Sequence, residues 1–180
     1  MIPQVLVPLA HGFEEIEATC PIDLLRRADV EVVTASCEDD LVVIGRSGIA
    51  LQAEVLLSDI SVESFDLLVL PGGPSVFKLR ERREILELIK SFHSTEKPIG
   101  AICAAPLLLH DAGLLKDLSY TAHGSVSNEL KEMKNDQAVV KDGLIITSRG
   151  AGTAVEFGLS LVELLCGREK ADEIRQSIHA

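Results

Sequence analysis

Continuous apolar runs alternate with helix-like patterns along this chain. Four of the runs have the length of a β-strand: residues 4–9 (QVLVPL), 30–36 (VEVVTAS), 65–70 (FDLLVL) and 98–102 (PIGAI). Strands that are apolar at nearly every position are typical of a parallel sheet that is covered on both faces. The pattern therefore predicts an α/β fold, a doubly wound sandwich with a mostly parallel sheet and helices on both faces.

Helical periodicity separates these runs. Residues 82–93 show it well, because Ile85, Leu88, Ile89 and Phe92 recur at the spacing of one helix face. We expect Pro21 to kink the first helix. The segments predicted to be helical are 14–28, 82–93, 104–111, 125–134, 153–165 and 168–178.

Turn signals predict two pairs of short strands. Residues 41–54 form one pair around a turn at Gly45–Gly48, and residues 139–147 form a hairpin around Asp142-Gly143. A further short strand is expected near residues 120–122.

Length and charge narrow the function classes. A chain of 180 residues is most simply one domain, spanning 1–180. Its formal net charge of −11 disfavours nucleic acids and anionic membrane surfaces as partners, because like charges repel. The chain has neither a basic leader nor a run of about 18 apolar residues, so a cytoplasmic protein without a membrane segment is expected.

The four cysteines are scattered at positions 20, 37, 103 and 166. Their spacing matches neither a CxxC pair nor a zinc site, so no metal is expected and four free thiols are predicted. Three of them are expected to act as small buried hydrophobes.

Cys103 is the exception because of its place in the pattern. It follows the strand at 98–102, and ligand sites in such sheets form beyond the carboxyl ends of the strands. The small neighbours Gly100, Ala101, Ala104 and Ala105 allow a sharp turn, and a helix starting there would favour the thiolate. The alternative is a buried cysteine that only fills space.

Two other strand ends carry candidate chemistry. Gly72 and Gly73, in Leu70-Pro71-Gly72-Gly73-Pro74, can present bare backbone N–H groups to a developing oxyanion, although Pro-Gly-Gly is more commonly a plain turn. His11-Gly12-Phe13 leads into three carboxylates, Glu14, Glu15 and Glu17.

These carboxylates have an ordinary explanation, since acidic residues suit the first turn of a helix. A buried one would instead have a raised pKa and could donate a hydrogen bond, and Glu17 has apolar neighbours, but helical spacing alone does not choose among the three. His123 is a candidate base or hydrogen-bond partner for the thiol. The alternative is a purely structural role in the turn before Gly124.

The stretch Ser148-Arg149-Gly150-Ala151-Gly152-Thr153 begins like a dinucleotide-binding motif but has Val155 at the third glycine position. The fingerprint therefore fails, no nucleotide cofactor is expected, and Thr153 is predicted to cap a helix.

Taken as a set, the pieces resemble the ThiJ/PfpI superfamily and, within it, the parkinsonism-associated deglycase branch called DJ-one in animals and YajL in bacteria. The matching stretches are Glu14-Glu15-Ile16-Glu17, Leu70–Pro74, Ala101–Pro106, Asp142–Gly150 and Gly152-Thr153. The resemblance spans nearly the whole chain.

The resemblance implies a flavodoxin-like fold, a homodimer and a reactive Cys103 that oxidises to a sulfinate. It implies that Glu17 is protonated and hydrogen-bonds the sulfur, and that His123 belongs to the pocket. Gly72, Gly73 and Ala104 match the backbone contributors to that pocket.

The chain departs from the family pattern at two places. Ala104 stands where protease-like members have a histidine, which argues against a Cys-His protease. Arg46-Ser47-Gly48 replaces the usual Ser-Arg-Gly, so a contribution of that arginine to a dimer or pocket does not carry over.

The resulting hypothesis is a cofactor-free enzyme that attacks α-oxoaldehydes such as methylglyoxal, or early glycation adducts on side chains, and releases lactate. Cys103 would add to the aldehyde, and Glu17 with His123 would move the proton. The alternative is a non-catalytic, redox-responsive chaperone or stress sensor switched by oxidation of Cys103. A cysteine peptidase ranks below both.

Overall fold

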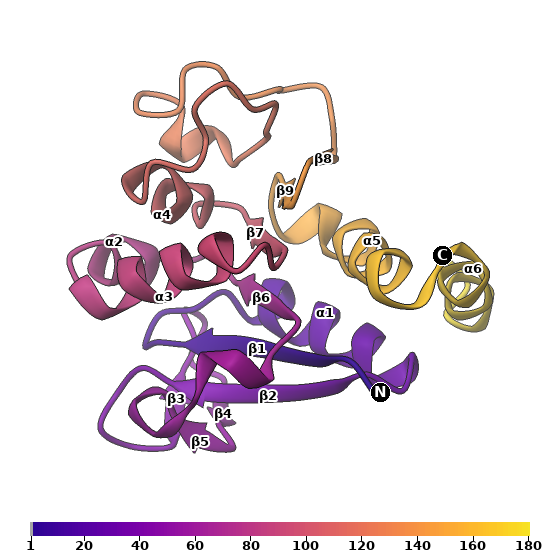
Figure 1. Ribbon diagram of the computed structural model, residues 1–180, viewed down its shortest axis with the longest axis horizontal. Helices are drawn as coiled ribbons and strands as arrows, with labels where there is room; N and C mark the ends of the chain where they lie inside the picture. The colour runs from indigo at the N-terminus through magenta and orange to yellow at the C-terminus, as the bar shows by residue number, and fades with distance from the viewer. Residues whose placement is uncertain (1) are drawn as a thin grey trace.

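A central sheet of seven strands organises the protein, whose computed structural model describes residues 2–180 (Figure 1). The strand order is β5-β2-β1-β6-β7-β9-β8, and all neighbours are parallel except the antiparallel pair β8 and β9. The strands are β1 (Gln4–Leu9), β2 (Glu31–Ser36), β5 (Val55–Leu56), β6 (Leu67–Leu70), β7 (Ile99–Ile102), β8 (Val139–Asp142) and β9 (Ile145–Ser148).

Helices cover both faces of this sheet, as the apolar runs predict. In Figure 1, α2, α3 and α4 lie to the left of the sheet, whereas α1, α5 and α6 lie to the right. The helices are α1 (Glu15–Arg27), α2 (Val76–Leu79), α3 (Arg83–Ser94), α4 (Pro106–Asp111), α5 (Ala154–Cys166) and α6 (Arg168–Ser177). The arrangement is a flavodoxin-like α/β sandwich.

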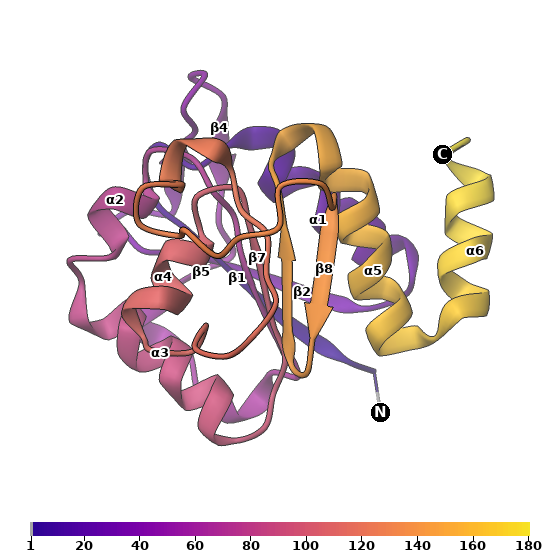
Figure 2. The same ribbon diagram turned by 90° about the horizontal axis from the view of Figure 1, so that it is seen from above.

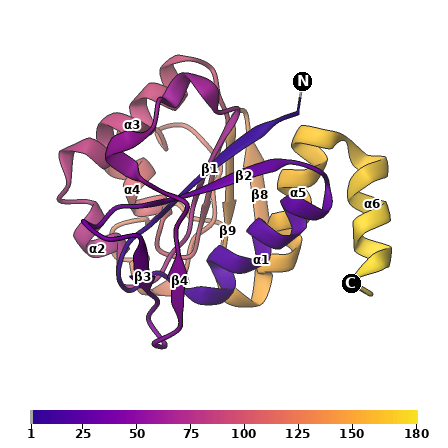
Figure 3. The same ribbon diagram turned by 90° about the horizontal axis from the view of Figure 1, so that it is seen from below.

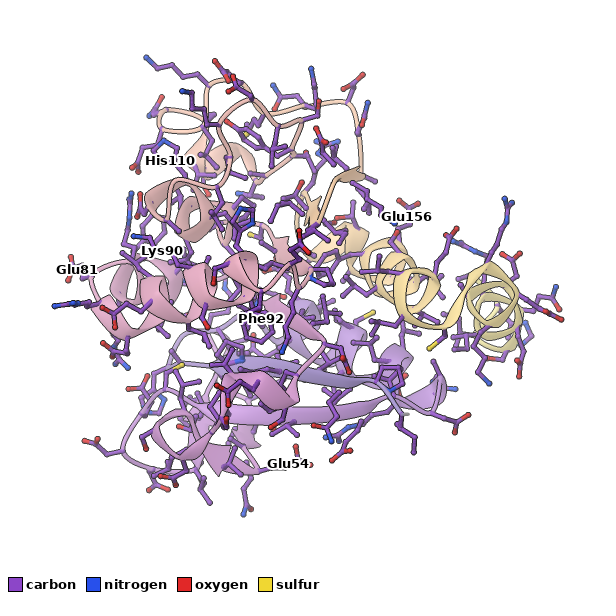
Figure 4. The ribbon with its side chains drawn as sticks, viewed as in Figure 1. Glu54, Glu81, Lys90, Phe92, His110 and Glu156 are labelled. Carbon is purple, nitrogen blue, oxygen red and sulfur yellow. The ribbon has the colours of Figure 1, made fainter. Side chains whose placement is uncertain are left out.

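The core divides between the two faces because side chains alternate along each strand. In β1, Leu6 packs with the α3 and α4 side, while Val5 and Val7 pack with the α1 and α5 side. Phe92 points from α3 towards the sheet and is fully buried (Figure 4). Phe157 of α5 and Phe13 are buried aromatics on the opposite face.

The helices on the second face pack closely on one another. In Figure 3, α1 and α5 lie side by side. Gly158 permits this contact, because a Cβ atom at that position would lie 2.6 Å from Leu24 Cδ1 and 3.3 Å from Pro21 Cα. Pro21 lies inside α1, which runs on past it. Helix α6 packs outside α5 at the edge of the molecule (Figure 2).

The predicted hairpin at residues 41–54 is confirmed as β3 (Val42–Ile44) paired antiparallel with β4 (Ala50–Gln52). It projects from one end of the sheet (Figures 2 and 3). The hairpin around Asp142-Gly143 is confirmed as β8 and β9, with Gly143 in the left-handed region at a φ of 58°.

Two predictions for residues 120–134 are wrong. Residues 120–122 form no strand, and the segment 125–134 contains only a 3₁₀ turn at Gly124–Val126 followed by irregular turns. Hydrogen bonds hold this segment in place instead. Thr121 N donates to Thr147 Oγ1 at 2.9 Å, and Lys134 N donates to the Tyr120 carbonyl at 2.7 Å.

The register of the sheet brings two loops together. Leu70 of β6 lies beside Ala101 of β7, so the turn that begins at Pro71 emerges next to Cys103. None of the helices formed by residues 2–180 has the length and apolar character needed to cross a membrane.

Candidate active site

Cys103 occupies a strained position directly after β7. Its φ of 65° lies in the left-handed region, which non-glycine residues seldom adopt. Both of its backbone groups are held, because Cys103 N donates to the Ser148 carbonyl and its own carbonyl accepts from His123 N, each at 2.9 Å. The surrounding structure therefore enforces the sharp elbow, a kind of strain that clusters at functional sites.

The helix after this elbow differs from the expectation. It begins at Pro106 rather than immediately after Cys103 and is six residues long, so its dipole is short. Individual backbone groups, rather than a helix dipole, favour the thiolate. Hydrogen bonding by the Ala104 and Gly73 backbones lowers the pKa of the Cys103 thiol.

The three carboxylates of the first helix have three different roles. Glu14 caps α1, because its Oε2 accepts a hydrogen bond from Glu17 N at 2.8 Å. Glu15 Oε1 faces the hairpin turn and accepts from Ser47 N at 2.7 Å. Glu17 faces Cys103, so the structure makes the choice that helical spacing could not.

The Glu17 side chain is only 1% exposed. Its Oε2 accepts a hydrogen bond from Gly72 N at 3.1 Å. Burial raises the pKa of this carboxyl to about 7, although hydrogen bonds from Cys103, Gly72 and Ala151 pull it down. A carboxyl with this pKa gains and loses its proton near neutral pH, as a general acid or base must.

Gly72 and Gly73 let the turn approach the site closely. A Cβ atom on Gly72 would lie 2.6 Å from Cys103 Cβ and 2.8 Å from the Ile102 carbonyl oxygen. Gly73 has a φ of 98°, and a Cβ there would lie 2.6 Å from Glu14 N. Both positions therefore require glycine.

The pKa of the Cys103 thiol is raised to about 12, first by burial and then by the charge of Glu17. The effect of Glu17 reverses when that carboxyl holds a proton, because a neutral acid donates a hydrogen bond to a thiolate instead of repelling it. One proton thus links the two groups: a thiol beside a carboxylate, or a thiolate beside a carboxylic acid.

The other three thiols lack this arrangement. All four cysteines are free and partly buried. Burial raises the pKa of Cys20, of Cys166 and, to about 12, of Cys37. Of the four, only Cys103 has a pKa that backbone hydrogen bonds lower, and only Cys103 forms a side-chain hydrogen bond with the buried Glu17.

His123 lies beside the site, but its ring is held by Ser125. Its Nδ1 accepts from Ser125 N at 3.1 Å and lies 2.9 Å from Ser125 Oγ. In the neutral ring this places the proton on Nε2. Among the described residues, the ring makes no hydrogen bond to Cys103. A Cβ built on Gly150 would lie 3.4 Å from His123 Cδ2 and 3.7 Å from Glu17 Oε1, so both groups border Gly150.

A cavity of about 440 Å³ adjoins His123 and Gly150, and it is also lined by Asn135, Arg149 and Ala151. The sequence did not single out these last three residues for the site. The signal for Arg149 and Ala151 was the stretch from Ser148 to Thr153 at the end of β9, the neighbour of β7, whereas Asn135 lies outside that stretch. Thr153 precedes α5 as predicted, but its Oγ1 bonds to Ser148 Oγ and Gly150 rather than capping the helix.

The candidate site contains neither a metal-binding cluster nor the side chain of Arg46. Among residues 2–180, no group of three or more His, Cys, Asp or Glu side chains is placed to hold a metal ion. Arg46 lies exposed on the β3–β4 turn, where its backbone N donates to the Phe13 carbonyl at 2.8 Å.

Comparison with known proteins gives one consistent result. The model of the DJ-1/PfpI family matches residues 3–164. Protein DJ-1 homolog A of Arabidopsis thaliana is 43% identical over 172 residues, which cover 94% of this chain but 44% of the relative. This chain therefore spans less than half the length of that relative.

Two animal proteins match over nearly their whole length. A glutathione-independent glyoxalase of Caenorhabditis elegans is 36% identical over 174 residues, covering 94% of this chain and 91% of the relative. The crystal structure of Drosophila melanogaster DJ-1beta superimposes with a TM-score of 0.96 at 35% identity, covering 100% of this chain and 99% of the other.

Proposed function

Because the chain belongs to the DJ-1/PfpI family, we propose that it is a cofactor-free, cysteine-dependent enzyme that converts α-oxoaldehydes such as methylglyoxal to hydroxy acids. Early glycation adducts on protein side chains are the related substrate class. The observation that carries the proposal is the strained Cys103 beside the buried carboxyl of Glu17, whose pKa is raised to about 7.

The first step of the proposed reaction forms a carbon–sulfur bond. The Cys103 thiolate adds to the aldehyde carbon and gives a hemithioacetal. The oxyanion that develops takes a proton from Glu17 or a hydrogen bond from the backbone N–H groups of Gly73 and Ala104. No redox cofactor is needed, because the substrate supplies both the carbon that is oxidised and the carbon that is reduced.

The second step moves hydrogen between neighbouring carbons. The Glu17 carboxylate removes the proton from the former aldehyde carbon, and a proton returns to the adjacent carbonyl carbon, which leaves a thioester. Water then hydrolyses the thioester, so that methylglyoxal and water give lactate and a proton and the thiol is regenerated. His123, with its proton on Nε2 at the cavity wall, is the candidate group to steady the substrate oxygen.

The test is lactate production from methylglyoxal. We expect wild-type protein to produce lactate after removal of metals, Cys103→Ser to be inactive and Cys37→Ser to retain activity. Assays at low free aldehyde with a glycated peptide would separate true deglycation from consumption of released methylglyoxal. Lactate production by Cys103→Ser equal to that of the wild type would refute the proposal.

A second candidate function rests on the same sulfur. The backbone groups of Gly73 and Ala104 that lower the thiol pKa are also suited to hold the oxygens of a Cys103 sulfinate. Oxidation would then switch a chaperone or stress-response role in a cytoplasmic homodimer. Suppression of client aggregation that depends on prior peroxide treatment and on Cys103 would support this candidate.

A further inference from the structure

A second cavity, of about 570 Å³, lies away from Cys103 and is larger than the one beside His123. It opens between the carboxyl end of β2, the short strand β5 with the turns that follow it, and helix α3. Ligand sites in open α/β sheets form beyond the carboxyl ends of strands, and pockets for small molecules range from about 300 to 1,000 Å³. Both its position and its volume are those of a ligand site.

The floor of this β2–α3 cavity is apolar. Leu88 of α3 is buried, and Leu57, Ile60 and Val62 are half-buried and pack on the same core cluster. These side chains already belong to the core on one side and face open volume on the other. An aromatic ring or a branched aliphatic group placed here would bury apolar surface without rearranging the core.

The rim of the cavity carries only negative charge. Four carboxylates line it, Glu38, Asp39, Glu84 and Glu87, and no lysine, arginine or histidine does. Arginines outside the lining neutralise two of them. Glu38 pairs with Arg82 at 3.1 Å, and Glu87 pairs with Arg83 at 2.6 Å.

Asp39 and Glu84 remain uncompensated. Both are exposed, and within residues 2–180 neither forms an ion pair. Glu38 is a fixed part of the wall, because its Oε1 also accepts a hydrogen bond from His11 N at 2.8 Å. The cavity therefore combines an apolar floor with two free negative charges at its mouth.

We propose that the β2–α3 cavity binds a small organic cation, an amine carried on an aromatic or branched aliphatic body. The body packs on Leu57, Ile60 and Leu88, and the ammonium group lies at the rim near Asp39 and Glu84. An anion of the same shape is repelled by Asp39 and Glu84, and the net charge of −11 adds to that repulsion. The site is independent of the chemistry proposed for Cys103.

The test compares two probes of similar shape and opposite charge, 2-phenylethylamine and 3-phenylpropionate, by calorimetric titration of the whole chain at low ionic strength. We expect the amine to bind at least tenfold more tightly than the acid, and its affinity to fall as salt is added. Equal binding of both probes, or no binding of the amine up to about 10 mM, overturns the proposal.

Variants locate the binding. Asp39→Asn combined with Glu84→Gln should weaken amine binding about three- to tenfold, because each exposed charge pair is weak. Ser58→Phe, a substitution at an exposed lining position, should block the cavity and abolish binding. The matched control is Glu156→Gln, a charge removal on α5 outside the cavity, which should change nothing (Figure 4).

Each result decides between outcomes. Loss of binding in Ser58→Phe without any effect of the double charge variant means a site for apolar molecules and overturns cation recognition. If amine binding is unchanged in Ser58→Phe and in the double charge variant, the ligand binds elsewhere, and the proposed site is overturned. Thermal melts of all variants establish that they are folded.

Discussion

Removing the Glu17 carboxyl tests the shared proton directly, because the two protonation states predict opposite signs. Suppose that Glu17 is ionised beside the sulfur. Its charge is then one of the causes that raise the pKa of Cys103 to about 12, so Glu17→Leu should lower that pKa. Suppose instead that Glu17 is protonated when the thiolate forms. Glu17→Leu then removes a hydrogen-bond donor and should raise the pKa.

We expect the second result. Glu17 is 1% exposed and its pKa is already raised to about 7 with a neutral thiol beside it. A thiolate in place of the thiol raises it further, because like charges repel. Below that value the carboxyl keeps its proton and donates a hydrogen bond to the thiolate.

The magnitude follows from the hydrogen bond that is lost. A buried hydrogen bond to a charged group contributes about 1.5–3 kcal/mol. At about 1.4 kcal/mol per pKa unit, this corresponds to a rise of about one to two units in the pKa of Cys103. Glu17→Gln is the matched control, because it keeps the volume and an N–H donor while removing the titrating proton. It should raise the pKa by less than Glu17→Leu does.

Ultraviolet absorbance of the thiolate, titrated against pH with Cys103→Ser as the blank, measures the shift. The rate of alkylation by iodoacetamide, mapped by peptide to Cys103, provides a second readout. Glu17→Leu should also slow aldehyde turnover near neutral pH. A lower Cys103 pKa in Glu17→Leu would show that the carboxyl is charged next to the thiolate, and the role of Glu17 as proton donor would be lost.

Four further outcomes are expected. Burial raises the pKa of Glu17 from 4.5 to about 7 in the folded state, so the folded state holds this proton more tightly than the unfolded state does. The free energy of unfolding, measured relative to Glu17→Gln, should therefore fall by about 3 kcal/mol between pH 4.5 and pH 8, and a pH-independent difference contradicts this. Gly72→Ala should lower the stability by about 1–3 kcal/mol and abolish lactate production, because its Cβ collides with the backbone and with Cys103; a fully active variant contradicts this. Mild peroxide should add two oxygens to Cys103, seen by intact mass and absent in Cys103→Ser, whereas only disulfide-linked dimers would contradict it. Sedimentation should give about twice the chain mass of 19.4 kDa, since Ile16 and Val155 are 53% and 38% exposed, and a monomer would contradict a dimer.

The strands of the sheet could be predicted because burial on both faces leaves a continuous apolar run. Strand β5 and helix α2 are too short, at two and four residues, to produce a pattern of their own. The segment 125–134 shows a clear helical pattern but forms no α-helix. Val126, Leu130 and Met133 have helical spacing and are all buried, yet the backbone between them forms turns. Apolar spacing records which side chains are buried, and here irregular turns bury the same set.

The place of the candidate site could also be predicted, because Cys103 and the Gly72 turn follow adjacent parallel strands. The choice of Glu17 among three carboxylates could not. It depends on how α1 is rotated about its axis where it packs on the sheet and on α5, a contact that includes Pro21 and Leu24 against Gly158. Because α1 and α5 are more than a hundred residues apart in the sequence, the local periodicity of α1 does not indicate this contact.

The enzymatic and redox hypotheses for Cys103 are linked by the chemistry of one sulfur atom. The backbone groups of Gly73 and Ala104 and the proton on Glu17 stabilise negative charge wherever it appears there: on a thiolate, on the oxyanion of an aldehyde adduct, or on a sulfinate. A sulfinate, however, has no free thiolate with which to attack an aldehyde. Every molecule that enters the oxidised state therefore leaves the catalytic one, and lactate production must fall in proportion to the sulfinate formed. A redox-sensing role thus uses the same preorganised donors, but a molecule whose Cys103 is oxidised for that role is no longer catalytically active.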